Sequence, residues 1–249
     1  MDTPHSESKW SPYLQRYLNN EWRGTIFRDM IIADANSLEQ QRGKLSFLDI
    51  GCGRGFDGDS ELQRSLANLS GKYFGIEPEN TVEVADFFST TYRCNLEDAP
   101  IQSDSIDIAF AFMVLEHFKE PQKCWNKIYN ILNKGGIFWG FTVDSRHWVK
   151  SASLLADRIG LKDMYLSALS CEPGKERSDS YKAYYRCNTP KQIQSQARLF
   201  SSMSVLNFIR VGQDDRYMPK KLRWVNRSYD RLAIRFGLPG SILAVRLVK

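Results

Sequence analysis

Three glycines at alternating positions follow an apolar run, and this pattern indicates ligand chemistry more clearly than any other in the chain. The run, residues 45–50, is typical of a buried parallel strand and includes Asp49. Gly51, Gly53 and Gly55 permit a tight turn and leave no Cβ between the backbone and a ligand. In α/β proteins a strand, a glycine turn and a helix build a nucleotide pocket at the carboxyl ends of the strands. The pattern therefore predicts a nucleotide-type ligand at this turn.

Charges around the turn indicate which ligand it binds. Asp49 precedes the turn, and Asp57 and Asp59 follow it, whereas a pyrophosphate requires a helix N-terminus without anions. The spacing G-x-G-x-G also differs from the dinucleotide pattern, and the chain has no phosphate loop of the form G-x-x-x-x-G-K-[ST]. Three carboxylates favour a cationic ligand such as S-adenosylmethionine, which carries an ammonium and a sulfonium. Glu77, at the end of the next predicted strand, can accept from both ribose hydroxyls or, alternatively, cap a following helix.

Polar residues after later strands are candidates for the chemistry itself. His117 follows the fourth predicted strand, and imidazole changes its protonation near neutral pH, which suits a general base. The alternative is that His117 only shapes the pocket. Asp144 and His147 follow the fifth predicted strand and are the next catalytic candidates, unless they belong to an ordinary polar loop.

A cluster further along the chain is the candidate for binding a substrate. Tyr184, Tyr185 and Arg186 could frame an anionic or aromatic acceptor, and Tyr181 lies just before them. They could equally form a strand edge that packs this segment against the sheet. The sequence leaves both interpretations open.

Strands and helices alternate along most of the chain. Apolar runs predict strands, and apolar residues at helical spacing predict helices. The predicted strands are residues 45–50, 72–77, 92–95, 106–112, 137–143, 205–211 and 242–248. The predicted helices are residues 59–69, 81–88, 121–132, 151–169 and 190–200, preceded by a loose tail (1–12) and a helical segment (13–41) that Gly24 weakens and that can form two helices. Such alternation implies an α/β protein with a mainly parallel sheet and helices on both faces.

Together these motifs resemble the class I S-adenosylmethionine-dependent methyltransferases. Residues 48–55 match the first motif of that family, and Glu77 matches its ribose-binding acid. The segments 95–100, 105–117 and 132–136 resemble its adenine-contacting segment, its fourth-strand motif and the turn before its fifth strand. The resemblance covers about residues 40–145. It implies a Rossmann-like methyltransferase fold, a seven-stranded mostly parallel sheet with helices on both faces and an antiparallel last strand.

The resemblance also implies a set of cofactor-binding residues; from the spacing of the cysteines and histidines we expect no metal. Phe112 and Met113 are expected to line the methionine end of the site or to fill the core. Asn95 stands where family members often have Asp, and its side-chain carbonyl can still accept from the adenine amino group. The full set is Asp49, Gly51, Cys52, Gly53, Gly55, Glu77, Asn95, Leu96, Phe112 and Met113.

The expected domain organisation is a single methyltransferase domain, residues 1–249. Residues 13–41 form its N-terminal helical segment and residues 45–143 its cofactor-binding core. Two insertions follow the fifth and sixth strands: a lid, 144–188, and a basic helical segment, 212–241. If these strands are parallel to the first, both insertions leave the sheet on the side of the glycine turn.

Basic residues are concentrated near the end of the chain. Residues 216–249 contain nine Lys or Arg and one Asp, a net charge of +8, whereas residues 1–215 carry −3. Arg223, Arg227, Arg231 and Arg235 form one stripe of a predicted helix, beside an apolar face of Val225, Tyr229, Leu232 and Phe236. The pattern is typical of an amphipathic helix with a solvated basic face. An anionic small molecule or glycan is the next interpretation, and nucleic acid or a membrane surface are lesser ones.

Composition excludes several classes of protein. The chain has 249 residues, of which 42% are hydrophobic and 25% charged, as in globular proteins. No apolar run approaches the roughly 20 residues of a membrane span, and the N-terminus has no signal-peptide core, so we expect a cytoplasmic protein. The spacing of the cysteines argues against a zinc site or disulfides and favours reduced, buried thiols. They are Cys52, Cys94, Cys124, Cys171 and Cys187.

These observations predict methyl transfer from S-adenosylmethionine to a small molecule or to a sugar of a glycan. Oxygen is the preferred nucleophile, before nitrogen and carbon. Positioning alone can supply on the order of 7–11 kcal/mol of the barrier, so a base is needed only for a poorly acidic acceptor. The alternatives are an RNA or protein methyltransferase and a catalytically silent partner subunit. The sequence does not define the acceptor or the oligomeric state.

Overall fold

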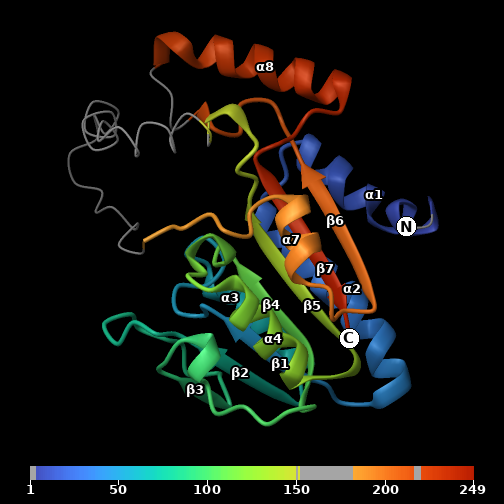
Figure 1. Ribbon diagram of the computed structural model, residues 1–249, viewed down its shortest axis with the longest axis vertical. Coiled ribbons are helices and arrows are strands. Elements are labelled where there is room, and N and C mark those ends of the chain that lie inside the picture. Colours follow the sequence, from blue (N-terminus) through green and yellow to red (C-terminus); the bar gives the residue numbers. More distant parts are fainter. Residues whose placement is uncertain (1–3, 150, 152–181, 216–219) are drawn as a thin grey trace.

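The computed structural model describes residues 4–149, 151, 182–215 and 220–249, in which seven strands form one sheet (Figure 1). The strand order is β3-β2-β1-β4-β5-β7-β6. Strand β7 is antiparallel to both β5 and β6, and the other pairs are parallel, which confirms the predicted fold class. The strands are β1 (Ser46–Ile50), β2 (Lys72–Ile76), β3 (Thr90–Tyr92), β4 (Ile106–Phe112), β5 (Leu132–Val143), β6 (Ser202–Phe208) and β7 (Ile242–Val248).

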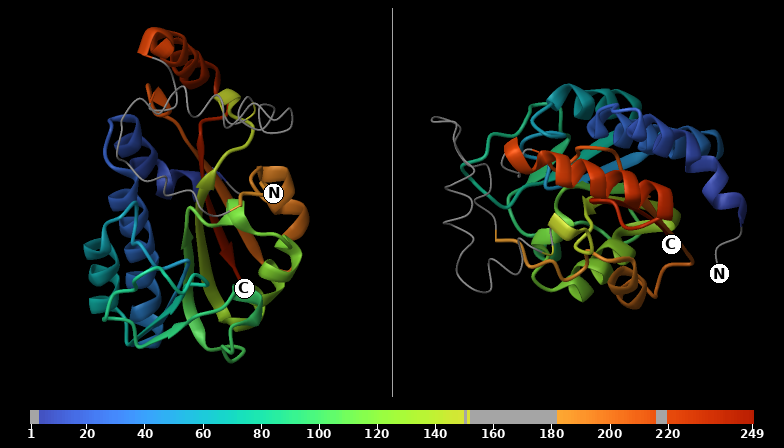
Figure 2. Two further views of the ribbon diagram at one scale, coloured as in Figure 1. Left: turned by 90° about the vertical axis from the view of Figure 1, so that its left-hand side faces the viewer. Right: turned by 90° about the horizontal axis from the view of Figure 1, so that it is seen from above.

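Helices cover both faces of the sheet, so that the structure has three layers (Figure 2). Alternating strand residues point to opposite faces, as the pleat requires. Phe47, Phe110 and Trp139 pack in one core with the N-terminal helices, and Leu48, Ala109 and Phe138 pack in the other. The first face carries α1 (Pro4–Leu18), α2 (Arg23–Arg42) and α3 (Ser60–Leu69), and the second carries α4 (Pro121–Ile131) and α7 (Pro190–Gln196). No helix in the described part of the chain is long and apolar enough to cross a membrane.

One edge of the sheet collects the loops that matter for function. Because β5 and β6 are both antiparallel to β7, they run parallel to β1 and β4, and all four end at the same edge. Helix α8 (Arg223–Phe236) lies across this end of the molecule, beyond the strands (Figures 1 and 2). The glycine turn, the loop after β4 and the segments after β5 and β6 therefore converge there.

The expected loose tail at residues 1–12 is wrong, because α1 already begins at Pro4. Trp10 is 2% exposed and packs edge-on against Trp139 of β5, with ring centroids 4.9 Å apart. Burial of a large aromatic side chain stabilises a helix that polar flanking residues do not predict. The N-terminal segment forms two helices, as the sequence allowed, but the break falls at residues 19–22 and Gly24 lies within α2.

The helix expected at residues 81–88 is also wrong, since this segment forms a loop. Arg93 Nη1 donates to the carbonyl oxygens of Glu79 and Val82, at 3.0 and 2.9 Å, and so satisfies acceptors that a helix would otherwise use. Phe88 stacks on Tyr73 with ring centroids 4.7 Å apart. Side-chain contacts thus override the local helical pattern.

Other boundaries shift by a few residues. Strands β4 and β7 match their predicted ranges, whereas β3 and β6 each begin two or three residues earlier than predicted. Helix α7 ends at Gln196 instead of residue 200, and α4 ends at Ile131, where β5 begins directly. The predicted helix 151–169, Cys171 and Tyr181 fall in the range 152–181, outside the described residues apart from Ser151.

A buried carboxylate links the N-terminal helices to the middle of the sheet. Asp34 on α2 is 1% exposed and accepts from Trp139 Nε1 at 2.9 Å and from Arg246 Nε at 2.6 Å. Lys9 of α1 reaches the same carboxylate at 3.1 Å. A buried charge is tolerated because its partners replace the lost hydration.

We expect Asp34→Ala to lower the free energy of unfolding by about 3 kcal/mol or more, because Arg246 and the Trp139 N–H lose their partner in a buried environment. Urea denaturation measures this change. The matched control, Glu61→Ala, removes an exposed ion pair with Arg64 and should change stability by less than about 1 kcal/mol. Equal effects of the two substitutions would contradict the assignment of Asp34 as a linking residue.

Candidate functional site

The glycine turn after β1 needs glycine for two physical reasons. Gly51 and Gly55 have positive φ angles of 77° and 70°, which side chains disfavour. In addition, a Cβ on Gly51 would lie 2.4 Å from Val114 Cγ2, and one on Gly55 would lie 2.4 Å from the Asp59 carbonyl oxygen. Both amides at the start of the turn, Gly51 and Cys52, donate to the Ile76 carbonyl oxygen at the end of β2. The turn is therefore fixed against β2 and against the loop after β4.

Glu77 lies directly against this turn. Its Oε2 accepts from the Gly53 amide at 3.1 Å, and its Oε1 accepts from the Glu79 amide at 2.9 Å. A Cβ on Gly53 would lie 2.5 Å from the same Oε2 and 2.4 Å from Val82 Cγ1. No helix follows in residues 78–89, so Glu77 closes a local turn and does not cap a helix. A carboxylate accepts up to about four hydrogen bonds, so one oriented by two amides is suited to bind ligand hydroxyls as well.

The three carboxylates around the turn have different partners. Asp59 caps α3 by accepting from the Glu61 amide at 2.8 Å, and Asp57 forms a bidentate ion pair with Arg23 of α2. These two residues therefore stabilise the turn and its helix. Because the N-terminus of α3 already carries a carboxylate, a ligand phosphate is disfavoured there.

Asp49 is buried on the α3 side of β1. Its Oδ2 accepts from Gln63 Nε2 at 2.7 Å and from the Tyr73 hydroxyl at 3.1 Å, and Gln63 also donates to the Cys52 carbonyl oxygen. Burial raises the pKa of Asp49 to about 7, and the charge of Glu77 adds to the increase, whereas the two hydrogen bonds oppose it. The charge of Glu77 thus disfavours the charged form of Asp49, and a bound cation would relieve this.

The remaining predicted cofactor residues surround the turn in different ways. The Cys52 side chain is 1% exposed and points into the core, so only its backbone can face a ligand. Asn95 is exposed at the start of the short helix η1 (Leu96–Asp98), and Leu96 is buried. Phe112 stacks on Phe56 at 5.0 Å. Met113 has a φ of 57° and is partly buried at the end of β4.

The loop after β4 brings His117 and the predicted acceptor residues together. The amides of Tyr184 and Tyr185 donate to the Glu116 carbonyl oxygen at 2.7 and 3.1 Å. Arg186 Nη1 donates to the Lys119 carbonyl oxygen at 2.7 Å. His117 Nδ1 lies 3.1 Å from the Lys182 carbonyl oxygen. Because a carbonyl oxygen only accepts, Nδ1 donates in this contact, and the lone pair of the neutral ring is on Nε2.

The aromatic and cationic side chains of this segment are also arranged together. Lys182 Nζ and the Arg186 guanidinium lie 5.5 and 5.4 Å from the centroid of the Tyr184 ring. Such contacts favour a fixed orientation of the ring and the cations. The backbone of this segment is therefore anchored to the β4 loop, while its side chains offer an aromatic surface and positive charge.

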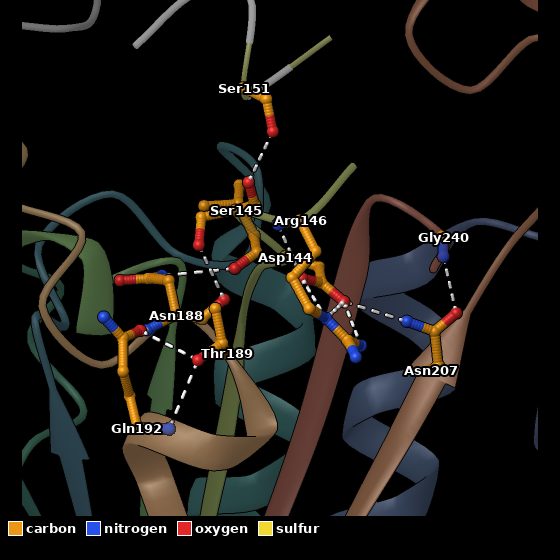
Figure 3. A network of polar contacts seen from close by, with 10 residues as sticks. Asp144, Ser145, Arg146, Ser151, Asn188, Thr189, Gln192, Asn207 and Gly240 are labelled. Carbon is orange, nitrogen blue, oxygen red and sulfur yellow. Dashed lines mark hydrogen bonds and ion pairs between the residues drawn. The ribbon is translucent and has the colours of Figure 1, made fainter. Parts of the chain in front are cut away.

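A buried polar network supports this anchoring. Thr142 Oγ1 of β5 donates to Glu116 Oε2 at 2.8 Å, and Asn188 Nδ2 donates to Thr142 Oγ1 at 2.8 Å. The Ser145 amide in turn donates to the Asn188 carbonyl oxygen (Figure 3). The loops after β4 and β5 and the segment before α7 are thus joined through one carboxylate.

Asp144 and His147 lie in a different part of the same edge. Asp144 is fully buried and binds Arg146 through both carboxylate oxygens, and Asn207 of β6 donates to it at 3.1 Å (Figure 3). His147 is 2% exposed, with Nδ1 3.4 Å from Asp214 Oδ2 and Nε2 3.7 Å from Asp230 Oδ1. Both residues therefore contact the β6 and α8 side of the edge, whereas His117 contacts the segment of residues 182–186, the predicted acceptor segment.

Several residues that shape the site have no signal in the sequence. Gln63 and Tyr73 reach Asp49 from neighbouring elements, and their role depends on packing that no local motif encodes. The other residues of this kind are Thr142, Asn188, Asp214 and Asp230.

Comparison with known proteins agrees with this fold. Residues 48–140 match the family model of the methyltransferase domain. A Thermotoga maritima S-adenosylmethionine-dependent methyltransferase, described as a possible histamine N-methyltransferase, is 13% identical; the match covers 95% of this chain and 98% of that one, with a TM-score of 0.51. A methyltransferase from Archaeoglobus fulgidus is 12% identical over 89% of this chain and 94% of its own, also with a TM-score of 0.51. At such low identity these structures show the fold alone. No curated protein matches the sequence.

The fold and the glycine turn define the class I methyltransferases, whose methyl donor is S-adenosylmethionine. The methyltransferase domain at residues 48–140, together with this fold, indicates that the chain is an S-adenosylmethionine-dependent methyltransferase. The cradle at Gly53 and Glu77 fits an adenosine without phosphates, since it offers an oriented carboxylate and a helix N-terminus that is already capped.

We expect Glu77→Gln to weaken S-adenosylmethionine binding by about 10- to 100-fold, because hydrogen bonds to a charged group contribute about 1.5–3 kcal/mol. Gly53→Ala should weaken it as well, since its Cβ would displace Glu77. Isothermal titration calorimetry measures both effects, with Glu61→Gln on the exposed side of α3 as the matched control. Unchanged affinity in both site variants would contradict this assignment.

The raised pKa of Asp49 predicts a pH-dependent stability of the ligand-free protein. Between about pH 4 and pH 7 the folded chain keeps a proton that the unfolded chain has lost, so the free energy of unfolding falls as the pH rises. The Asp49→Asn variant should lack this contribution, of up to about 1.4 kcal/mol per pH unit. Urea denaturation at several pH values measures it, and identical slopes in the two proteins would exclude it.

Proposed function

We propose that this enzyme transfers the methyl group to a hydroxyl of a small molecule or of a sugar in a glycan. The observation that carries the proposal is the position of His117, whose Nδ1 donates to the Lys182 carbonyl oxygen beside Tyr184 and Arg186. The same loop after β4 also contacts the glycine turn, where Val114 packs against Gly51. A base and an acceptor surface thus adjoin the site of the methyl donor.

The proposed chemistry is an in-line displacement. When bound, the donor supplies a methyl group activated by a sulfonium. Glu77 and the glycine turn hold the donor, and the Tyr184 ring and Arg186 orient the acceptor. His117 Nε2 accepts the hydroxyl proton as the new O–CH3 bond forms, and the products are the methyl ether, protonated His117 and S-adenosylhomocysteine.

In this proposal Asp144 and His147 support the site without contacting the acceptor. Asp144 is occupied by Arg146 and Asn207, and His147 is buried between Asp214 and Asp230. Their expected role is to hold α8 and the strand ends in place. Substrate contact by His147 would need a displacement of α8.

Acceptor class can be tested with isotopically labelled S-adenosylmethionine. The proposal predicts label transfer to members of a panel of sugars, nucleotide sugars and hydroxylated small molecules, with S-adenosylhomocysteine formed in equal amount. Transfer to RNA or to protein, with none to this panel, would favour the alternative acceptor classes. If the donor binds but no acceptor is methylated, the result would contradict the proposal and favour a catalytically silent partner subunit.

Removal of the proposed base should affect turnover and not donor binding. We expect His117→Ala to lower kcat by about 100-fold or more, a typical effect of a positioned general base, and to leave the calorimetric donor affinity unchanged. Lys123→Ala, at an exposed position of α4, is the control and should keep full activity. Retained turnover in His117→Ala would exclude the base role.

A further inference from the structure

Helix α8 is oriented opposite to an ordinary amphipathic surface helix, since it turns polar side chains toward the protein. Asn226 and Asp230 are buried, and Asp230 Oδ2 accepts from the Gly212 amide at 2.7 Å. Asn226 Nδ2 donates to Asp215 Oδ1 at 3.0 Å. Hydrogen bonds of this kind dock the helix, and Ala233 is the one apolar residue of α8 that is fully buried beside them.

Most of the large apolar residues of α8 and of its two flanks are exposed instead. Trp224, Leu232 and Phe236 are 67%, 51% and 65% exposed. In the described part of the chain, eight large hydrophobic side chains are exposed, and six of them lie between residues 222 and 238. Isolated exposed apolar residues need no explanation, but a contiguous group marks an interaction surface.

Basic residues border this apolar group. Arg231 and Arg235 follow Trp224 by seven and eleven residues and therefore share its side of the helix. Lys220 and Lys221 precede the helix and are exposed. The sole acidic residue in the range 220–238 is Asp230, which faces the protein. We call this surface the outer face of α8, and it is both apolar and cationic. Its residues are Lys220, Lys221, Trp224, Arg231, Leu232, Arg235 and Phe236.

We propose that the outer face of α8 binds the surface of a membrane that contains anionic lipids. An interfacial helix combines Trp, Phe and Leu, which enter the headgroup region, with Lys and Arg, which pair with anionic headgroups. The charge and the exposed side chains of α8 match both requirements. This inference is independent of the acceptor proposed above.

Two other partners fit the outer face less well. A second copy of the chain packed on the same face would bring its cations against those of the first, which disfavours the contact. RNA would neutralise the cations, and a base could stack on the Phe236 ring. Leu232, however, would have no apolar partner in such a complex. A lipid surface satisfies both kinds of side chain.

Vesicle flotation tests the proposal with the full-length chain. We expect strong binding to phosphatidylcholine vesicles that contain about 30% phosphatidylserine, weak binding to pure phosphatidylcholine, and loss of binding at high salt. Arg231→Glu with Arg235→Glu, and separately Trp224→Ser with Phe236→Ser, should each weaken binding by about tenfold or more.

Matched controls distinguish an effect of α8 on vesicle binding from a general effect of surface charge or hydrophobicity. Lys44→Glu with Lys72→Glu changes exposed charges at the opposite edge of the sheet, and Leu199→Ser removes an exposed apolar residue elsewhere. Both should keep vesicle binding. Retained binding of S-adenosylmethionine by every variant reports that the fold is intact.

Three outcomes would overturn the proposal. The first is equal binding to both kinds of vesicle, or binding to neither. The second is loss of binding in the control variants to the same extent as in the α8 variants. The third is that the α8 substitutions abolish a different complex while vesicle binding stays unchanged. This complex could be a dimer, measured by light scattering, or a complex with RNA.

Discussion

The glycine turn can approach Glu77 because Gly53 has no side chain, and the rest of the proposed cofactor site depends on this contact. The Gly53 amide orients the carboxylate, and the Glu79 amide fixes it from the other side. Gly51 allows a second close approach, to Val114 of the β4 loop. The loops of β1, β2 and β4 are thereby placed within one small region, where a donor and an acceptor can meet.

A second constraint is the burial of polar groups along the same edge. Glu116, Thr142 and Asn188 form a chain of hydrogen bonds below the acceptor segment, and Asp144 joins Arg146 to β6. Such networks are costly when a member is missing, so they favour a single arrangement of the loops. Methyl transfer needs alignment more than acid–base chemistry, and a rigid edge supplies it.

The sequence predicts the parts of this structure that arise from local pattern. Strands β4 and β7 have uniform apolar runs, and their predicted ranges match the structure. The glycine turn and Glu77 are recognisable because a close backbone approach requires glycine and an acid at fixed places along the chain. The pattern at residues 81–88 predicts a helix, whereas the structure has a loop there. Arg93 and Tyr73 contact this segment from elsewhere in the chain, and such contacts leave no trace in the local pattern.

Helix α8 illustrates the same limit. The sequence shows which residues share one side of the helix, but not which side packs against the protein. Asn226 and Asp230 pack inward because Gly212 and Asp215 offer partners from another loop. The separation of His147 from His117 follows from the same docking, since Asp214 and Asp230 bury the His147 side chain.

The structure of the complex with S-adenosylhomocysteine tests the central claim most directly. The predicted result places both ribose hydroxyls on the Glu77 carboxylate, with the adenosine against the Gly51–Gly55 turn and its base beside Leu96. A nucleoside bound elsewhere, or a Glu77 carboxylate that makes no contact with it, would contradict the assignment of this edge as the cofactor site.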